Sequence, residues 1–420
     1  MFANSPMRCT GGELKEEKGL TLLLLVRANG RPANMVTYNI RPVIGFLCRV
    51  FSLAILPVCL VFADVRAIPG EESVYYEKAR SVANELTQGA QPYDALLGAS
   101  TLAELGDVNA YKVIVEYASS ADLMVQRAAI DTLISINQPQ SLALLMDITA
   151  DDETLFGYMI GGLAANPRED ATDLLYAALA NENEAIRIHA LKALAEVGHA
   201  SALHPFWTIA RDKHEKLLVR AYAYYGIARL GQGDTTLDQL LEIASSGGTK
   251  EKEIVAVSLG AMNTIKSHAV LTELINNDDV RVSIAALVSD VALRNPQSRK
   301  QFVKLITQGD PYRASIAAAG LKRVPPDIAM QVTSQIIECC DISSEAALRL
   351  MEAWAWIDFD NIEPVLHWGL KHPEADVNLV TLWVIGSRGE RKNRSKLTDY
   401  LDAENPAIRG MAAWAVVKSK

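Results

Sequence analysis

A motif recurs about every 31 residues from Ala95 to the C-terminus, and no other feature constrains the fold of this chain as strongly. The copy around Arg187 is the clearest. Ile186 precedes this anchor, small or apolar residues follow at three, six and seven positions, and Gly198 stands at eleven. A period in this range indicates a solenoid of stacked units rather than a closed globule. The anchor positions are Ala95, Gln126, Phe156, Arg187, Arg220, Glu253, Arg281, Arg313, Leu348, Asn378 and Arg409.

Each unit is predicted to hold two helices. The apolar positions around an anchor have helical spacing, and a shorter, less regular apolar segment follows each of them. Side chains that cap helix N-termini stand before several anchors, namely Asp122, Asn183, Asp279, Asp310 and Asn405. Glycines that end helices in the left-handed conformation follow at Gly106, Gly198, Gly231 and Gly389. The pattern therefore predicts an all-α solenoid (superhelix) of about eleven two-helix repeats.

The two ends of the solenoid are expected to be capped separately. Residues 71–88 are predicted to form an extra amphipathic helix that covers the N-terminal end. The last unit begins at Asn405, holds only one helix, and ends in the polar residues Lys418, Ser419 and Lys420. Solenoids need polar outer faces at their terminal units, so both segments are interpreted as caps.

The N-terminal segment resembles an export signal. Residues 50–63 carry no charge, Arg41 and Arg49 precede them, and Ala63 closes a possible cleavage site. We expect a signal peptide at residues 35–63, an over-extended and unstructured start at 1–34, and the solenoid at 64–420. The mature chain would be exported, periplasmic or secreted. The alternative is a retained membrane anchor through residues 50–63, although this run is short for a span.

Composition narrows the choice of partners. Half of the residues are hydrophobic and only 6% are aromatic, which is typical of many short packed helices. The formal net charge is −9. An acidic chain is a poor partner for nucleic acid or for an anionic membrane surface. A protein or peptide partner is expected instead.

The motif of Asp or Asn, then Val/Ile-Arg, then an Ala-rich helix and Gly resembles the HEAT repeat, in the short form shared with phycobilin lyases. The resemblance covers roughly residues 72–420, and with the export signal it implies a bacterial exported HEAT-repeat protein. It implies that the anchored helices line the concave side. It also implies that anchor arginines form a structural ladder between adjoining repeats; these are Arg187, Arg220, Arg281, Arg313 and Arg409.

No set of residues predicts catalysis, a metal or a cofactor. The seven His form no zinc motif, and the single His-Glu pair, His214-Glu215, cannot enclose a metal alone. Cys339 and Cys340 are adjacent, and a bond between them would require the helix to break, because neighbouring helical side chains point about 100° apart. They are interpreted as two small apolar residues at a helix end. A vicinal disulfide or a soft-metal site is the alternative.

Aromatic residues are the candidates for partner binding. The first, fifth and eighth residues after each anchor are predicted to face the concave side. Tyr225, Trp356, Trp383 and Trp414 occupy such positions, and Trp and Tyr are enriched in binding hot spots. The alternative is that these rings fill seams between repeats. A basic turn lies beside them and could steer an acidic partner; its candidate residues are Arg388, Arg391, Lys392 and Arg394.

These features predict a non-enzymatic interaction scaffold that presents a concave solenoid surface outside the cytoplasm. Two alternatives stay open. One is a lyase-like or other enzyme built on the same scaffold, and the other is a membrane-tethered structural spacer. Convergent His and carboxylates in one pocket would favour the enzyme, and a uniformly short, polar concave face would favour the spacer.

Overall fold

The computed structural model describes residues 22–23, 37–38, 71–262 and 264–419, and the chain divides into two units, residues 1–67 and 68–420. In the first unit, β1 (Leu22–Leu23) pairs with β2 (Thr37–Tyr38) in an antiparallel register that sets Leu22 opposite Tyr38. β2 falls within the predicted signal peptide, residues 35–63. The rest of that segment, with its predicted cleavage site, lies outside the described residues. None of the helices in the described part of the chain combines the length and apolar character that a membrane span requires.

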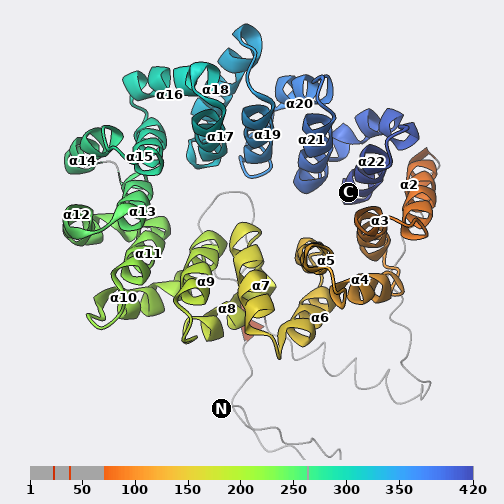
Figure 1. The fold of residues 1–420 in the computed structure, drawn as a ribbon, viewed down its shortest axis with the longest axis horizontal. Coiled ribbons are helices and arrows are strands. Elements are labelled where there is room, and N and C mark those ends of the chain that lie inside the picture. Colours follow the sequence, from red (N-terminus) through yellow and green to blue (C-terminus); the bar gives the residue numbers. More distant parts are fainter. Residues whose placement is uncertain (1–21, 24–36, 39–70, 263, 420) are drawn as a thin grey trace, which may run out of the picture. The chain divides into compact units, whose positions relative to one another are not determined.

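The second unit is an α-solenoid (Figure 1). Eleven anchored helices of the described region form its inner row: α3 (Pro92–Glu104), α5 (Leu123–Ser135), α7 (Glu153–Ala165), α9 (Glu184–Val197), α11 (Leu217–Ile227), α13 (Thr249–Leu259), α15 (Val280–Ala292), α17 (Pro311–Gly320), α19 (Ser344–Ala353), α21 (Ala375–Arg388) and α22 (Pro406–Lys418). The predicted number of repeats and the all-α class are confirmed.

The second helix of each repeat forms the outer row. These helices are α4 (Ala110–Ala118), α6 (Pro139–Thr149), α8 (Thr172–Ala178), α10 (Leu203–Arg211), α12 (Leu237–Ser246), α14 (Ile265–Ile275), α16 (Pro296–Gln308), α18 (Pro326–Cys339) and α20 (Glu363–Leu370). In the tenth repeat two 3-10 helices take this place, η7 (Arg391–Leu397) and η8 (Asp399–Asp402). Shorter turns complete the second unit: η2 (Glu169–Ala171), η3 (Ala200–Ala202), η4 (Ala228–Gln232), η5 (Gly233–Thr236) and η6 (Leu321–Arg323).

The local signals in the sequence act as expected. The side chains of Asp122, Asn183, Asp279, Asp310 and Asn405 each accept a hydrogen bond from a backbone N–H in the first turn of an inner helix. They satisfy donors that have no partner inside the helix. The four predicted stop glycines all adopt positive φ, between 63° and 84°. A side chain is strained in this conformation, which explains glycine at the end of these helices.

The prediction of two separate caps is wrong, because the two ends of the solenoid pack against each other. α2 (Glu71–Thr87) lies against both α3 and α22, and α22 also contacts α3. One hydrophobic core contains Val82 and Leu86 of α2 together with Trp414 and Val416 of α22. We call the contact of α22 with α2 and α3 the closing junction.

The closing junction continues the pattern of the repeats. α2 packs against inner helices α22 and α3 in the outer row, the place that the second helix takes in the other repeats. Side chains of α2 and α3 pack directly on the backbone of α22 here, since a Cβ on Gly410 would lie 2.6 Å from Leu86 Cδ1 and 2.7 Å from Leu97 Cδ2. Ser419, expected in a polar terminus, is fully buried. The eleventh repeat is therefore assembled from α22 and α2, two helices that are far apart in sequence.

Ionic contacts also cross the closing junction. Arg409 pairs with Glu85 at 2.7 Å and Lys418 pairs with Glu104 at 2.8 Å. Lys78 of α2 pairs with Asp402 of η8. Opposite charges at these places orient the two ends, although partly exposed pairs contribute only about 0–1 kcal/mol each.

Candidate functional site

The predicted aromatic positions separate into three environments. Tyr225, Trp383 and Trp414 all stand five residues after an anchor, on inner helices. Trp356 does not share this helical face, because α19 ends at Ala353 and Trp356 lies in the following turn with 45% of its surface exposed. The prediction that Trp356, Trp383 and Trp414 form one stripe is therefore wrong.

Tyr225 links two neighbouring repeats. It is buried on α11, and its hydroxyl donates a hydrogen bond to the carboxylate of Glu196 at the end of α9. Arg229 donates to the other oxygen of Glu196 at 3.0 Å. The pKa of Tyr225 is raised above its usual range, mainly because the ring is buried and also because the Glu196 charge lies beside its hydroxyl. This ring lies in a seam between repeats, as the alternative interpretation held.

Trp383 and Trp414 line one pocket at the closing junction. Trp383 on α21 is half-buried, and Trp414 on α22 is 6% exposed with Lys418 Nζ 5.8 Å from its ring centre. The volume is about 300 Å³, at the lower end of the range for ligand pockets. We call it the junction pocket. Its lining comes from inner helices α3, α5, α21 and α22: Tyr93, Asp94, Leu96, Leu97, Ser100, Ala128, Thr132, Ser135, Leu379, Trp383, Ala407, Met411 and Trp414.

The junction pocket is largely apolar with few polar groups. The rings of Tyr93, Trp383 and Trp414 and the side chains of Leu97 and Met411 supply apolar surface. Asp94 is its one acidic lining residue, and no basic side chain lines it. Such a site suits an apolar side chain or a small apolar body, with a preference for a positive charge beside it. The sequence missed this pocket because half of its wall comes from the other end of the chain.

The predicted basic turn is mostly engaged inside the molecule. The Arg388 guanidinium pairs with Glu390 and donates to the carbonyls of Ile357 and Phe359. The Arg394 side chain is buried and donates to Tyr76 Oη and to the carbonyl of Ser419. Both arginines therefore hold the tenth repeat and the closing junction together.

The other two members of the turn are exposed. Lys392 pairs with Glu390 at 3.1 Å and donates to the carbonyl of Asp360, and Arg391 stands beside it. Burial alone would raise the pKa of Glu390, but hydrogen bonds from Arg388 and Lys392 hold it below its usual value. Only the Arg391 and Lys392 side chains are placed where a partner could touch them.

The anchor residues do have a shared structural task in several repeats. Arg187 donates to the carbonyls of Asn181 and Glu182 and forms a two-bonded pair with Glu215 of the next repeat. Arg409 donates to the carbonyls of Ala403 and Glu404. The last carbonyls of an outer helix and its loop lack helical partners, and the anchor side chains satisfy them.

Anchors that depart from Arg can perform the same task. Asn378 donates to the carbonyls of Gly369, Leu370 and His372 around the end of α20. Gln126 donates to Ala118 at the end of α4, as Arg220 does to Ala210 at the end of α10. In these five repeats the anchor position therefore supplies a hydrogen-bond donor, whatever its residue type.

Arg281 and Arg313 form no such bonds. Among the described residues, Arg281 pairs only with the cap carboxylate of Asp279, at 3.7 Å, and Arg313 only with that of Asp310, at 3.3 Å. Both side chains are about half exposed. The predicted ladder role is therefore wrong for these two anchors.

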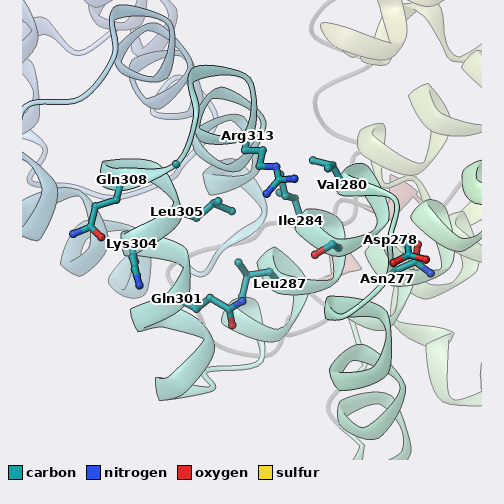
Figure 2. A pocket seen from close by; sticks show the side chains of 12 residues that line it. Asn277, Asp278, Val280, Ile284, Leu287, Gln301, Lys304, Leu305, Gln308 and Arg313 are labelled. Atoms are coloured by element: carbon teal, nitrogen blue, oxygen red, sulfur yellow. The ribbon is translucent and has the colours of Figure 1, made fainter.

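Arg313 instead lines a second pocket (Figure 2), which we call the Arg313 pocket. Its volume is about 420 Å³, and it lies among α15, α16 and the first turn of α17. Val280, Ile284, Leu287 and Leu305 form its apolar part. The polar lining residues are Asn277, Asp278, Ser283, Gln301, Lys304, Gln308 and Arg313, and Gly309 completes it.

The two cysteines form a vicinal disulfide, so their interpretation as two plain apolar residues is wrong. α18 ends at Cys339, and Cys340 has an extended backbone conformation. The break in the helix that such a bond requires is present. Cys339 is exposed, and no third metal ligand joins the pair, since residues 71–262 and 264–419 contain no group of three or more His, Cys, Asp or Glu able to hold a metal.

A family model matches the first part of the solenoid. The HEAT-repeat family model matches residues 80–156 and 157–228. The chain matches no curated protein. Among solved structures, an engineered protein is similar at 14% identity and a TM-score of 0.29, over 81% of this chain and 98% of that one. A mutant of Kap121p is similar at 12% identity and a TM-score of 0.30, over 80% of this chain, which spans 45% of the Kap121p chain.

The repeat match over residues 80–228 and the eleven inner helices of the described region define the class: an α-solenoid that contains HEAT repeats. The resemblance to HEAT repeats is thereby confirmed. Solenoids of this class commonly act as protein-interaction scaffolds, and the fold alone assigns neither a partner nor an activity.

Proposed function

We propose that this protein is a non-enzymatic scaffold that binds a protein partner through its inner face, and that it works in an extracytoplasmic compartment. The observation that carries the proposal is the junction pocket. It joins two of the aromatic residues expected to bind a partner, Trp383 and Trp414, in an apolar recess of about 300 Å³. Half-buried aromatic anchors in a pocket are the usual centres of binding energy at protein interfaces.

The pocket also indicates what the partner presents. An apolar side chain fits against Trp383, Leu97 and Met411, and Asp94 favours a Lys or Arg next to it. The partner segment is therefore an apolar residue flanked by a basic one. This charge agrees with the net charge of −9 of the chain.

The proposed compartment follows from the N-terminal sequence alone. The uncharged run at residues 50–63 and the site at Ala63 support cleavage, and the mature chain would begin near Asp64. N-terminal sequencing of the protein isolated from its own cells tests this. An intact N-terminal segment on protein recovered from the cytoplasm would contradict it.

The binding proposal is tested with Trp383→Ala in the full chain. Captured partners from the exported fraction are identified by mass spectrometry, and the affinity of each is then measured for the wild type and the variant. We expect a loss of about 2 kcal/mol or more of binding free energy, since an aromatic anchor is removed.

Trp207→Ala is the matched control. Trp207 is also half-buried, but it lies on outer helix α10 against Arg211, outside the junction pocket. It should leave partner binding unchanged. Equal losses from Trp207→Ala and Trp383→Ala, or a Trp383→Ala protein that binds normally, would reject the junction pocket as the partner site.

A further inference from the structure

Arg313 differs from most anchors of its kind in a way that points to a ligand. The guanidinium groups of Arg187 and Arg409 donate hydrogen bonds to backbone carbonyls that precede their helices. The side-chain amides of Asn378 and Gln126 donate to such carbonyls too. Within the described residues, the one ion pair of the Arg313 side chain is with Asp310 of its own helix cap, through Nε. Its two terminal nitrogens are therefore available on a side chain that is 53% exposed.

The surroundings of Arg313 form a pocket with a charged rim and an apolar wall. Figure 2 shows the guanidinium directed from α17 toward Ile284 and Leu305. Lys304, one residue before Leu305 on α16, lines the same pocket, is exposed, and forms no ion pair with any residue that the structure describes. Two cations thus border the recess, and Asp278 is the one carboxylate among its lining residues, although the protein as a whole is acidic.

The other lining residues determine which ligand body and which charge the pocket can hold. Ile284 and Leu287 are 3% and 2% exposed and form the floor, with half-buried Val280 and Leu305 beside them. Asp278 lies on the side of the pocket away from Lys304 (Figure 2). A second negative charge on the ligand would meet Asp278, so only one is favourable. The volume of about 420 Å³ is within the range for small organic ligands.

We infer that the Arg313 pocket binds a small organic monocarboxylate with an apolar body, such as a medium-chain fatty acid. The carboxylate would accept two hydrogen bonds from the Arg313 guanidinium, the pairing that its planar donors favour, with Lys304 adding charge. The apolar body would lie on Ile284, Leu287 and Leu305. This site is distinct from the junction pocket and does not depend on the proposed scaffold function.

Calorimetric titration of the full chain with octanoate, 1-octanol and acetate tests the inference. Octanoate should bind saturably, one per chain. 1-Octanol lacks the carboxylate and acetate lacks the apolar body, so each should bind at least about tenfold more weakly, as the loss of a charged hydrogen bond or of a buried hydrocarbon chain predicts.

Arg313→Gln removes the charge and keeps most of the side-chain bulk. It should weaken octanoate binding at least about tenfold while leaving the affinity for 1-octanol unchanged. Lys304→Gln should weaken octanoate by a smaller factor. Thermal unfolding of Arg313→Gln should match the wild type, since Arg313 makes no bond to another helix in the described structure.

Arg281→Gln is the matched control. Arg281 holds the same anchor position one repeat earlier, is 48% exposed, and contacts the equivalent cap carboxylate, but it does not line the pocket. Octanoate binding should be unchanged in this variant. The inference is overturned by equal affinities for octanoate and 1-octanol, by equal effects of the two arginine variants, or by the absence of saturable octanoate binding.

Discussion

Two junctions of the solenoid join inner helices in the same way but differ in sequence separation. One is the junction between α9 and α11, and the other is the closing junction. The fourth and fifth repeats are neighbours in sequence, and the Arg187–Glu215 pair and the Tyr225–Glu196 bond span 28 and 29 residues. At the closing junction, Arg409 and Glu85 are 324 residues apart. The regular junction forms from local contacts, whereas the closing junction can form only after the repeats between its two halves are folded.

Equivalent residues nevertheless occur in the two junctions. The fifth position after the anchor is Tyr225 on α11 and Trp414 on α22, and both are 6% exposed. Each ring contacts the inner helix of the preceding repeat, since Tyr225 bonds to Glu196 of α9 and Trp414 packs on Gly386 of α21. The sixth position is Ala193 in one and Ala415 in the other, and both are fully buried. The comparison teaches that the closing junction is a true inter-repeat interface, not a loose contact of two termini. Substitutions at matched positions of the two junctions test this conclusion.

The largest effect is expected from Trp414→Ala. Removing this buried ring leaves a cavity among α21, α22 and α3, at a cost of about 3–5 kcal/mol of unfolding free energy. Hydrogen exchange should show α2, α3 and α22 opening before the middle repeats. Trp356→Ala, at an exposed ring, should stay within about 0.5 kcal/mol of the wild type. Uniform loosening across all repeats would contradict a separate closing junction.

An intermediate effect is expected from the matched pair Ala193→Leu and Ala415→Leu. Both enlarge a fully buried residue, which should cost roughly 1–3 kcal/mol of unfolding free energy through overpacking. Because a solenoid couples nearest neighbours, Ala193→Leu should loosen the third to fifth repeats. Ala415→Leu should instead loosen α21, α22 and the N-terminal helices α2 and α3. Hydrogen exchange distinguishes these outcomes; protection in α2 and α3 that is unaffected by Ala415→Leu would show that the ends are not coupled.

The smallest effect is expected from Tyr225→Phe, which removes one hydrogen bond to Glu196 and should cost about 1 kcal/mol near neutral pH. The pKa of Tyr225 is raised in the folded state, so its unfolded form ionises first, near pH 10. The stabilisation is therefore complete below about pH 10 and is lost as the pH rises toward the folded pKa.

Urea unfolding of the wild type and Tyr225→Phe between pH 7 and pH 11 measures this difference in unfolding free energy. The advantage of the wild type should shrink above about pH 10. Trp414→Phe, at the matched position without an ionisable group, should show a difference from the wild type that does not follow this curve. A Tyr225→Phe difference that stays constant to pH 11 would mean that the buried hydroxyl contributes no linked proton.

The local elements of the fold could be predicted because their determinants are short-range. Cap side chains such as Asp122 and Asn183 and the stop glycine Gly198 act within a few residues, so the helix boundaries follow from neighbouring positions. The number of repeats follows in the same way from the anchors. The sequence also identified Trp383 and Trp414, since large aromatic residues at equivalent helical positions are visible without a structure.

The environments of those residues could not be predicted. Arg187 and Arg313 have the same position in the motif, yet one holds the next repeat and the other lines a pocket. The difference depends on where the preceding outer helix and its loop lie in space. The sequence likewise predicts an exposed basic turn at Arg388 and Arg394. In the structure, Arg388 donates to the carbonyl of Ile357 and Arg394 to that of Ser419, which lie 31 and 25 residues away in sequence.

The sequence by itself determined the helices, the repeat and the class of solenoid, because each of these depends on capping, periodicity and contacts between adjacent units. Only the tertiary structure decided that the solenoid closes, that α2 completes the repeat of α22, and that Trp383 and Trp414 share a pocket with Tyr93 and Leu97. The physical reason is the curvature of the stack. Small rotations between successive repeats add up over eleven units, and no single repeat records whether that sum brings the two ends together.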